Sequence, residues 1–262
     1  MADVRIAIFG TGLIGGQVAA LLTASGHEVV PVNRRSGVDT TTGAGVAEAL
    51  VAVDVVLDAT NPRVWSDDEV LAFFESSTAT LLTAERAAGV RHHVTISVVG
   101  ADRVPDSGYF RAKRLQEQMV SGGGIPHTIV RSTQFFEFLS EIADAASVDG
   151  VVRMTPALAQ PIASSDVAAK IAEVLLDDPR EDGLQIAGPD RLPLDEFVRH
   201  LLSATGDRRR LESDPAARYF GARLTTESLT PEGDAWMGPT SFYAWLRGAY
   251  RWLDSESPKA AV

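Results

Sequence analysis

A glycine-rich turn near the start of the chain constrains its fold more than any other feature. An apolar run over residues 4–9 leads into this turn, and a stretch of helical composition follows it. The turn has the pattern G-x-G-x-x-G and consists of Gly10, Thr11, Gly12, Leu13, Ile14 and Gly15. The first glycine permits a tight turn, the second lets a pyrophosphate approach the backbone, and the third lets the helix pack closely on the strand. Since the free N–H groups of the helix then face an anion, the turn predicts a strand–turn–helix unit that binds a dinucleotide.

Short apolar runs alternate with longer amphipathic ones through the first 131 residues. The expected strands cover residues 4–9, 28–32, 54–59, 93–99 and 128–131, and the expected helices cover residues 13–25, 46–53, 67–88 and 107–121. Strands that alternate with helices form βαβ units, which build a parallel sheet covered by helices on both faces. We therefore predict an α/β fold of the Rossmann type with a doubly wound parallel sheet.

After residue 131 the alternation becomes less regular. Helices are expected over residues 134–146, 164–176, 193–205 and 239–253, with a short strand over residues 184–187. This pattern predicts a small, mainly helical C-terminal region on the substrate side. We accordingly divide the chain into a dinucleotide-binding domain, residues 1–155, and a substrate-side or lid region, residues 156–262, which packs on it and shares its core.

The composition excludes several kinds of site and partner. The chain has no Cys, which excludes a disulfide scaffold, a thiolate metal site and a cysteine nucleophile. The net charge of −11 disfavours nucleic acid and anionic membranes as partners. No apolar run reaches the roughly 18–20 residues of a membrane span, and the glycine turn interrupts any secretory signal pattern. We expect a cytoplasmic protein with a small-molecule substrate and no metal site, and a homodimer is compatible with the sequence.

Two arginines at the end of the second expected strand indicate which cofactor is bound. NAD-binding proteins usually carry an acidic residue about 20 residues past the glycine turn, whereas an arginine there accommodates a 2′-phosphate. Here the strand ends in Asn33, Arg34 and Arg35, and no acidic residue follows before Asp39. Two guanidinium groups can form forked, charge-assisted hydrogen bonds to a phosphate. These residues therefore predict NADP(H) rather than NAD(H).

The next expected strand ends at the same edge of the sheet. Its last residues are followed by Ala59, Thr60 and Asn61. Since ligands of open α/β sheets bind at the carboxyl ends of the strands, these three residues are candidates to line the cofactor groove. The alternative is an ordinary turn, because Asn61 precedes a proline.

A tyrosine and a lysine four residues apart lie on the helix expected over residues 107–121. Tyr109 and Lys113 form the pattern Y-x-x-x-K, and this spacing places both side chains on one helix face. A nearby ammonium favours the phenolate and should lower the pKa of the tyrosine. Such a tyrosine can protonate a carbonyl oxygen as hydride arrives, and the lysine can hold the nicotinamide ribose.

Together these motifs resemble the short-chain dehydrogenase/reductase superfamily, and most of all its atypical, NmrA-like branch. The resemblance extends from residue 3 to about residue 205 and is carried by residues 10–15, 33–35, 96–100, 109–113, 124–136, 161–168 and 186–189. In that family, the segment that resembles residues 124–136 includes the turn beside the nicotinamide. The resemblance therefore implies cofactor contacts for Ser132 and Thr133.

The resemblance also implies a Ser–Tyr–Lys constellation, in which the serine orients the substrate carbonyl. Family members often carry two consecutive serines at the end of the strand, and the second is the usual catalytic residue. Here Ser97 is followed by Val98. Ser97 is thus a candidate for catalysis and cofactor contact, or a structural hydroxyl that points into the sheet.

The function expected from these residues is an NADPH-dependent reductase of a carbonyl, quinone or conjugated small molecule, with Tyr109 as proton donor. A first alternative is a redox sensor that binds NADP(H) without turnover and contacts a protein partner, as the resemblance implies for some members. A second alternative is a nucleotide-sugar epimerase or dehydratase. We rank it last because such enzymes tend to carry a larger C-terminal domain than this chain provides.

Overall fold

The centre of the fold is a seven-stranded sheet in a computed structural model that describes residues 4–64 and 66–250. The strand order is β12-β9-β5-β4-β3-β1-β2, and every neighbouring pair is parallel. The strands are β1 (Arg5–Phe9), β2 (Glu28–Val32), β3 (Val55–Asp58), β4 (His92–Val98), β5 (His127–Ser132), β9 (Leu184–Ala187) and β12 (Trp236–Met237). The chain passes from β1 to β2 on one side and returns to β3 on the other. Ligands of such sheets bind at this switch point, outside the carboxyl ends of the strands.

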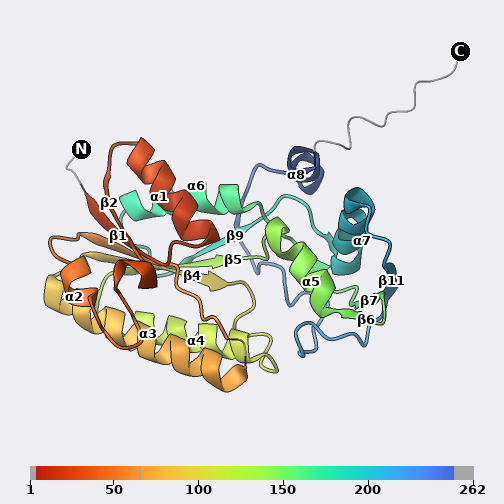
Figure 1. Ribbon diagram of the computed structural model, residues 1–262, viewed down its shortest axis with the longest axis horizontal. Coiled ribbons are helices and arrows are strands. Elements are labelled where there is room, and N and C mark those ends of the chain that lie inside the picture. Colours follow the sequence, from red (N-terminus) through yellow and green to blue (C-terminus); the bar gives the residue numbers. More distant parts are fainter. Residues whose placement is uncertain (1–3, 65, 251–262) are drawn as a thin grey trace, which may run out of the picture.

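Helices cover both faces of this sheet (Figure 1). On one face α1 (Leu13–Ala24) packs against α6 (Ser164–Leu176), and on the other face α3 (Asp67–Ala88) packs against α4 (Gly108–Ser121). The short helix α2 (Val46–Ala49) contacts α3. This arrangement confirms the predicted doubly wound α/β fold.

The apolar strands are buried because both faces of the sheet are covered. In β1, Ile6 and Ile8 belong to a core cluster with residues of α1 and α6, while Ala7 and Phe9 belong to a cluster on the opposite face. All four side chains are fully buried. This explains why the central strands are continuously apolar in sequence.

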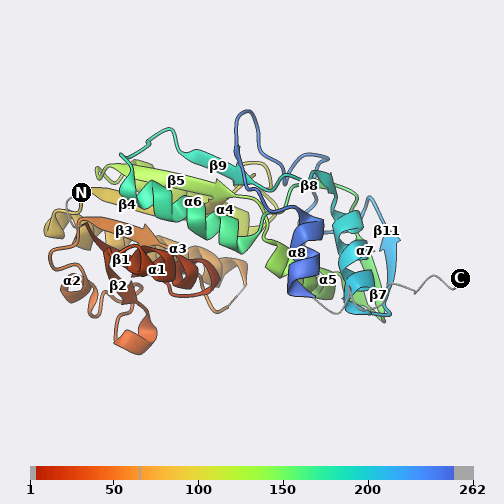
Figure 2. The ribbon, with the colours of Figure 1, turned by 90° about the horizontal axis from the view of Figure 1, so that it is seen from above.

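The remaining elements form a C-terminal region beyond the carboxyl ends of the strands (Figure 2). It contains the helices α5 (Leu139–Ala145), α7 (Leu194–Thr205) and α8 (Phe242–Ala249) and the strands β6 (Ser147–Val148), β7 (Val151–Met154), β8 (Leu158–Ala159), β10 (Leu192–Pro193) and β11 (Arg210–Ser213). Its core contains the fully buried rings of Phe136, Phe197 and Phe242. The small strands in this region, and β12 in the central sheet, were not predicted.

Segments that follow residue 155 contribute to both halves of the molecule. α6 and β9 complete the central sheet and its helical layer, whereas α7 and α8 build the C-terminal core. Both hydrophobic cores therefore contain side chains from before and after residue 155, the boundary that we propose between residues 1–155 and 156–262.

Three predicted helices are clearly shorter in the structure. The helix expected over residues 46–53 is the single turn α2 (Val46–Ala49), which ends at the C-cap residue Leu50. The helix expected over residues 134–146 starts only at the 3-10 turn η2 (Phe136–Phe138), which leads into α5. The preceding backbone is extended because Ile162 donates to the Gln134 carbonyl and accepts from the Phe136 N–H. The helix expected over residues 239–253 begins at Phe242 because Asp166 binds the backbone N–H and the hydroxyl of Thr240. Its predicted end, residues 251–253, lies outside the described residues.

The described residues form neither a membrane-spanning helix nor a metal-binding cluster. No helix there is long and apolar enough to cross a membrane, and no group of three or more His, Cys, Asp or Glu side chains is arranged to hold a metal ion. The adjacent His92 and His93 of β4 instead bond separately to Thr128 and Glu85.

Candidate active site

The three glycines of the turn have three different surroundings. Gly10 has a φ of +92°, and a Cβ atom there would lie 2.4 Å from the Ala59 carbonyl oxygen. A Cβ atom at Gly15 would lie 1.9 Å from the Gly10 carbonyl oxygen. A Cβ atom at Gly12 would have no heavy atom within 4 Å. Gly10 is therefore required by its left-handed backbone and by the adjacent loop after β3, and Gly15 by the packing of the turn itself. Gly12 is exposed and leaves space above the backbone.

The first turn of α1 fits a bound pyrophosphate. Its N-cap residue is Gly12, no side chain accepts a hydrogen bond at this cap, and the first turn holds no acidic residue. By contrast, α3 carries three acidic residues in its first turn. The N–H groups at the start of α1, which include those of Leu13 and Ile14, can therefore face an anionic ligand without competition from a side chain.

Asn33 connects the end of β2 to the glycine turn. Its Nδ2 atom donates a hydrogen bond to Thr11 Oγ1 at 2.8 Å. Its Oδ1 atom accepts from the backbone N–H groups of Arg35 and Ser36 at 2.8 and 3.2 Å, which caps the 3-10 turn η1 (Arg34–Ser36). The structure thus brings Asn33 and the two arginines to the same corner of the sheet as the glycine turn.

The two arginines project from η1 toward solvent. The Arg34 Nε atom lies 3.5 Å from the Asp39 carboxylate, and both side chains are accessible. The hydroxyl and N–H of Thr41 donate to the same carboxylate and hold the pKa of Asp39 below its usual value. An exposed ion pair of this kind is weak, so the Arg34 guanidinium can exchange this partner for a phosphate.

A buried carboxylate organises the loop that follows β3. Asp58 Oδ1 accepts hydrogen bonds from the Thr60 backbone N–H at 3.0 Å and from the Thr60 hydroxyl at 2.6 Å. Ala59 donates its N–H to the Phe9 carbonyl at 2.8 Å, and Asn61 is exposed. The segment is therefore a turn, and it lies directly against Gly10 of the glycine turn. Its contribution to a ligand would come from backbone groups and from Asn61, because the Thr60 hydroxyl already has an acceptor.

Tyr109 and Lys113 share one face of α4, next to Phe74 of α3. The Tyr109 ring meets the Phe74 ring edge-on, with centroids 6.2 Å apart. The Lys113 Nζ atom lies 4.4 Å from the centroid of the same ring. Lys113 is only 3% exposed, and its ammonium donates to the Ile96 carbonyl at 2.7 Å and to the Gln116 side chain.

Burial shifts the pKa values of both groups toward their neutral forms. Burial raises the pKa of Tyr109 to about 12. Burial lowers the pKa of Lys113 to about 8, against the opposing influence of Asp58 and Glu117. The expectation that Lys113 lowers the tyrosine pKa is therefore wrong for this structure, because loss of solvation raises the pKa of Tyr109. Tyr109 remains a protonated phenol near neutral pH.

Ser97 lies inside the sheet layer. Its side chain is 4% exposed, and its Oγ atom is buried without a hydrogen-bond partner in the described part of the chain. Neighbouring side chains of a strand point to opposite faces. It is Val98, the next residue, that packs with Tyr109 against the C-terminal core cluster.

Ser132 and Thr133 stand at the carboxyl end of β5 and are buried. The Ser132 hydroxyl donates to the Thr133 carbonyl at 3.0 Å, and the Thr133 hydroxyl donates to the Gln160 carbonyl at 2.7 Å. Both hydroxyls thus stabilise the crossing from β5 to the C-terminal region. Contacts of these two residues with a cofactor would use their remaining acceptor capacity or their backbone.

Two residues near Tyr109 were missed by the sequence analysis. Gln134 is 9% exposed, and its Oε1 atom is buried without a partner among the described residues. Tyr219 is 8% exposed. Its burial and the neighbouring Tyr109 raise its pKa, while a hydrogen bond with Gln134 lowers it. Tyr219 starts a tight two-residue turn over Phe220 and Gly221, whose φ values are 45° and 82°. The only signal in the sequence is an aromatic pair before a glycine.

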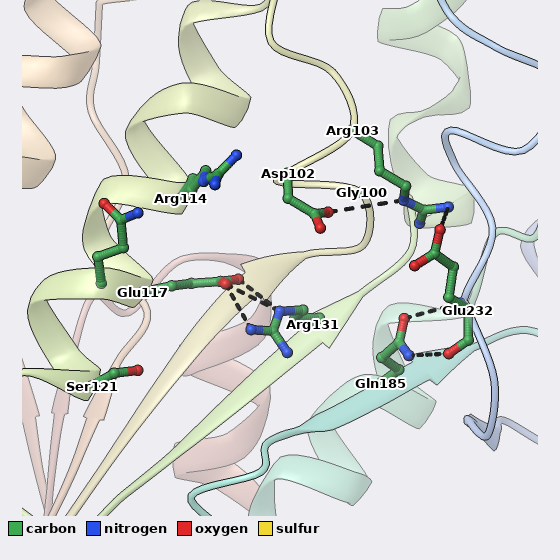
Figure 3. Close-up of a pocket in the computed structure, with 10 residues that line it drawn as sticks. Gly100, Asp102, Arg103, Arg114, Glu117, Ser121, Arg131, Gln185 and Glu232 are labelled. Atoms are coloured by element: carbon green, nitrogen blue, oxygen red, sulfur yellow. Dashed lines mark hydrogen bonds and ion pairs between the residues drawn. The ribbon is translucent and has the colours of Figure 1, made fainter.

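A charged cavity of about 470 Å³ lies beside the other flank of α4 (Figure 3). It is lined by Gly100, Asp102, Arg103, Arg114, Glu117, Gln118, Ser121, Arg131, Gln185 and Glu232. Arg131 binds Glu117 at 2.8 Å, and Arg103 binds Glu232 at 3.2 Å, so opposite charges are paired across it. None of the predicted cofactor or catalytic residues lines this cavity.

Comparison with known proteins identifies relatives in sequence. A family described as NAD(P)H-binding matches residues 10–178. A (4-alkanoyl-5-oxo-2,5-dihydrofuran-3-yl)methyl phosphate reductase of Streptomyces griseus is 30% identical over 220 residues, which are 77% of this chain and 74% of the relative. The matched family segment begins at the glycine turn and ends just after α6.

Solved structures share the fold over nearly the whole chain. The dTDP-4-dehydrorhamnose reductase of Bacillus anthracis in complex with NADP has a TM-score of 0.67 at 16% identity and covers 97% of this chain and 99% of its own. A nucleoside-diphosphate-sugar epimerase from Staphylococcus aureus has a TM-score of 0.67 at 16% identity, with coverages of 93% and 100%. The match covers the whole of this epimerase, so the expectation that such enzymes carry a larger C-terminal domain is wrong for it. The length of the chain therefore does not separate a reductase from an epimerase.

Proposed function

The chain belongs to the NAD(P)H-binding family, and from this premise we propose that it is an NADPH-dependent reductase of a small molecule with a conjugated carbonyl group. One observation carries the proposal. An accessible glycine turn and a partly buried tyrosine with a buried lysine lie at the same carboxyl edge of the sheet, at Gly12 and at Tyr109 with Lys113. The relative from Streptomyces griseus supports the choice of acceptor, since its name specifies reduction of an unsaturated lactone phosphate.

The side chains at this edge can supply the proton that the reduction requires. When bound, the reduced nicotinamide supplies a hydride, and the product then needs one proton. The Tyr109 phenol is protonated near neutral pH because its pKa is raised to about 12. It donates its proton to the oxygen or carbon that becomes basic as hydride arrives. The Lys113 ammonium, one helical turn away, stabilises the phenolate that remains. Ser97 and Lys113 are both buried, at 4% and 3% exposure, whereas Tyr109 is partly exposed.

The two arginines at the end of β2 provide the first test of the cofactor. Replacing both Arg34 and Arg35 with Ala should weaken NADPH binding at least about 100-fold, since it removes two charge-assisted hydrogen bonds worth about 1.5–3 kcal/mol each. NADH, which lacks the 2′-phosphate, should lose less than about twofold. Calorimetric titration of the wild type and the variant with both cofactors measures this. Asp39→Asn serves as the control, because it breaks the Arg34 ion pair and keeps both guanidinium groups. Equal losses for NADPH and NADH would contradict the assignment to NADP(H).

Tyr219 and Gln134 are proposed to bind the substrate from the C-terminal side. Replacing Tyr219 with Phe removes one hydroxyl beside Tyr109 and should raise the KM for the acceptor about 3- to 10-fold, the value of a single hydrogen bond. The Kd for NADPH should not change. Steady-state kinetics at fixed NADPH measures the effect. Tyr243→Phe is the matched control, since the exposed Tyr243 hydroxyl of α8 bonds to His200 of α7. An unchanged KM in Tyr219→Phe would remove Tyr219 from the substrate site.

One observation favours a second candidate function, a sensor that binds NADP(H) without turnover. Val98 packs with Tyr109 against the C-terminal core cluster, whereas the Ser97 hydroxyl is buried without a partner among the described residues. This placement supports a site in which the serine of the resembled constellation takes no part. Tight NADPH binding without NADPH oxidation across a panel of enones, quinones and aldehydes would favour the sensor. Oxidation of NADPH with any of these acceptors would favour the reductase.

A further inference from the structure

A line of buried polar side chains connects the loop after β3 to Lys113. Asp58, the last residue of β3, is 2% exposed, and its Oδ2 atom accepts a hydrogen bond from Gln116 Nε2 at 2.8 Å. The Oε1 atom of Gln116 in turn accepts from the Lys113 ammonium. The other Asp58 oxygen accepts from Thr60, in the loop at the proposed cofactor groove. Each oxygen of the Asp58 carboxylate therefore accepts hydrogen bonds from a different element, Oδ1 from the loop after β3 and Oδ2 from α4.

The chemistry of these groups determines the direction of the hydrogen bonds. An ionised carboxylate only accepts, and an ammonium only donates. Gln116 carries one donor group and one acceptor, so its NH₂ must turn toward Asp58 and its oxygen toward Lys113. A buried negative charge and a buried positive charge are thus joined through a single oriented amide. An unpaired charge in such surroundings would be costly.

The other groups around Lys113 leave Asp58 as its main counter-charge. On the same helix, Glu117 is engaged by Arg131 of β5, with Nε–Oε1 and Nη2–Oε2 distances of 3.0 and 2.8 Å. β4 offers the neutral Ile96 carbonyl, and α3 offers the Phe74 ring. Glu117 is therefore already neutralised by an arginine.

Two other titratable residues, His93 and Tyr109, lie near Asp58 and Lys113. The imidazole of His93 on β4 is affected by Asp58 but is bonded to Glu85 of α3 within 3.0 Å. Tyr109 is neutral near pH 7 because its pKa is raised to about 12. Neither residue supplies an uncompensated charge that could replace Asp58.

We propose that Asp58 and Gln116 are positioning residues, which keep the Lys113 amine protonated and hold it on the helix face that carries Tyr109. The effect on turnover rests on the proposed reductase function, whereas the charge link itself is a property of the free protein. The link also joins the nucleotide side of the site, through Thr60, to the side that supplies the proton. Asp58 therefore acts on the reaction through Lys113 and does not touch the substrate.

The small number of lysines makes the charge of Lys113 directly measurable. The chain has three, Lys113, Lys170 and Lys259. Protein labelled with 13C at lysine Cε gives one NMR signal for each, and the Lys113 signal is assigned by its loss in Lys113→Arg. Titration of this signal with pH, without substrate or cofactor, reports the protonation of the Lys113 amine.

Two variants and one matched control test the link. Asp58→Asn keeps an acceptor for Gln116 but removes the charge, and Gln116→Met breaks the link at similar volume. In each, the acid dissociation constant of Lys113 should rise at least about tenfold relative to wild type. Asp54→Asn makes the same change at the opposite end of β3, where the carboxylate bonds to Arg5 and Arg91. It should leave the Lys113 titration unchanged.

Either variant decides the question alone if the other does not fold, with thermal melting as the check on folding. An unchanged Lys113 titration in a folded Asp58→Asn or Gln116→Met protein overturns the proposal. Measurements of turnover then distinguish the charge link itself from the role of Lys113 in the reductase reaction. The high-pH decline of kcat should move to lower pH in Asp58→Asn. If the titration of Lys113 moves and this decline does not, the charge link stands and the proposed role of Lys113 in the reductase reaction fails.

Discussion

Replacing Tyr109 with Phe is expected to lower the rate of NADPH-dependent reduction by about 100- to 10,000-fold, the usual contribution of a positioned general acid. NADPH binding should change by less than about twofold, because the phenyl ring keeps the edge-on contact with Phe74. The reason for the loss is chemical: the Tyr109 phenol is protonated near neutral pH and is held against the C-terminal core, one helical turn from the Lys113 ammonium. Single-turnover kinetics with saturating NADPH measures the effect on the chemical step.

Ser97→Ala is the comparison that gives this result its meaning. The Ser97 hydroxyl is buried without a described partner, so its removal should change turnover by less than about threefold and leave thermal stability nearly unchanged. A large loss in Ser97→Ala would show that the serine reaches the substrate after all. Full turnover in Tyr109→Phe would mean that hydride transfer to the conjugated acceptor does not depend on this phenol.

Replacing Gly12 with Val is expected to abolish cofactor binding without unfolding the protein. A Cβ atom at Gly12 meets no heavy atom within 4 Å, so the folded chain has room for it. The same space is where the pyrophosphate must approach the start of α1. Loss of two or more charge-assisted hydrogen bonds to the phosphates should raise the Kd for NADPH at least about 100-fold. Calorimetric titration together with thermal melting measures both expectations.

Two other glycines of the same segment provide contrasting controls. A Cβ atom at Gly15 would lie 1.9 Å from the Gly10 carbonyl oxygen, so Gly15→Ala should destabilise the fold by at least about 1–3 kcal/mol through overpacking. A Cβ atom at Gly16 would lie 3.5 Å from the Thr11 carbonyl oxygen, an ordinary contact, so Gly16→Ala should retain both fold and binding. If Gly12→Val bound NADPH normally, the glycine turn would not be the phosphate site.

Sequence reasoning works best here where structure is encoded locally. The helix expected over residues 67–88 is α3 (Asp67–Ala88), with acidic residues in its first turn and Gly89 in the left-handed conformation after its end. The strand expected over residues 28–32 is β2. In both, periodicity and end signals lie within the element itself. The spacing of Tyr109 and Lys113 is likewise local, and helix geometry alone brings both to one face.

The same reasoning is weakest where distant segments decide the outcome. The helix expected over residues 134–146 is shortened because Ile162, almost thirty positions later, takes up the hydrogen bonds at Gln134 and Phe136. The strand β12 exists because Trp236 and Met237 pair with β9 at the edge of the sheet. Neither event leaves a periodic signal in the short segment concerned.

The sequence by itself determined the order of strands and helices up to residue 131, the glycine turn, and the placement of Tyr109 and Lys113 on one helix face, because each is encoded by neighbours within a few residues. The tertiary structure alone decided the environment of these groups. It buries Lys113 so that its ammonium depends on Gln116 and Asp58, encloses the Ser97 hydroxyl, and raises the pKa of Tyr109 by desolvation. Burial and charge pairing are properties of the packed molecule, since they depend on which distant side chains exclude water from a site.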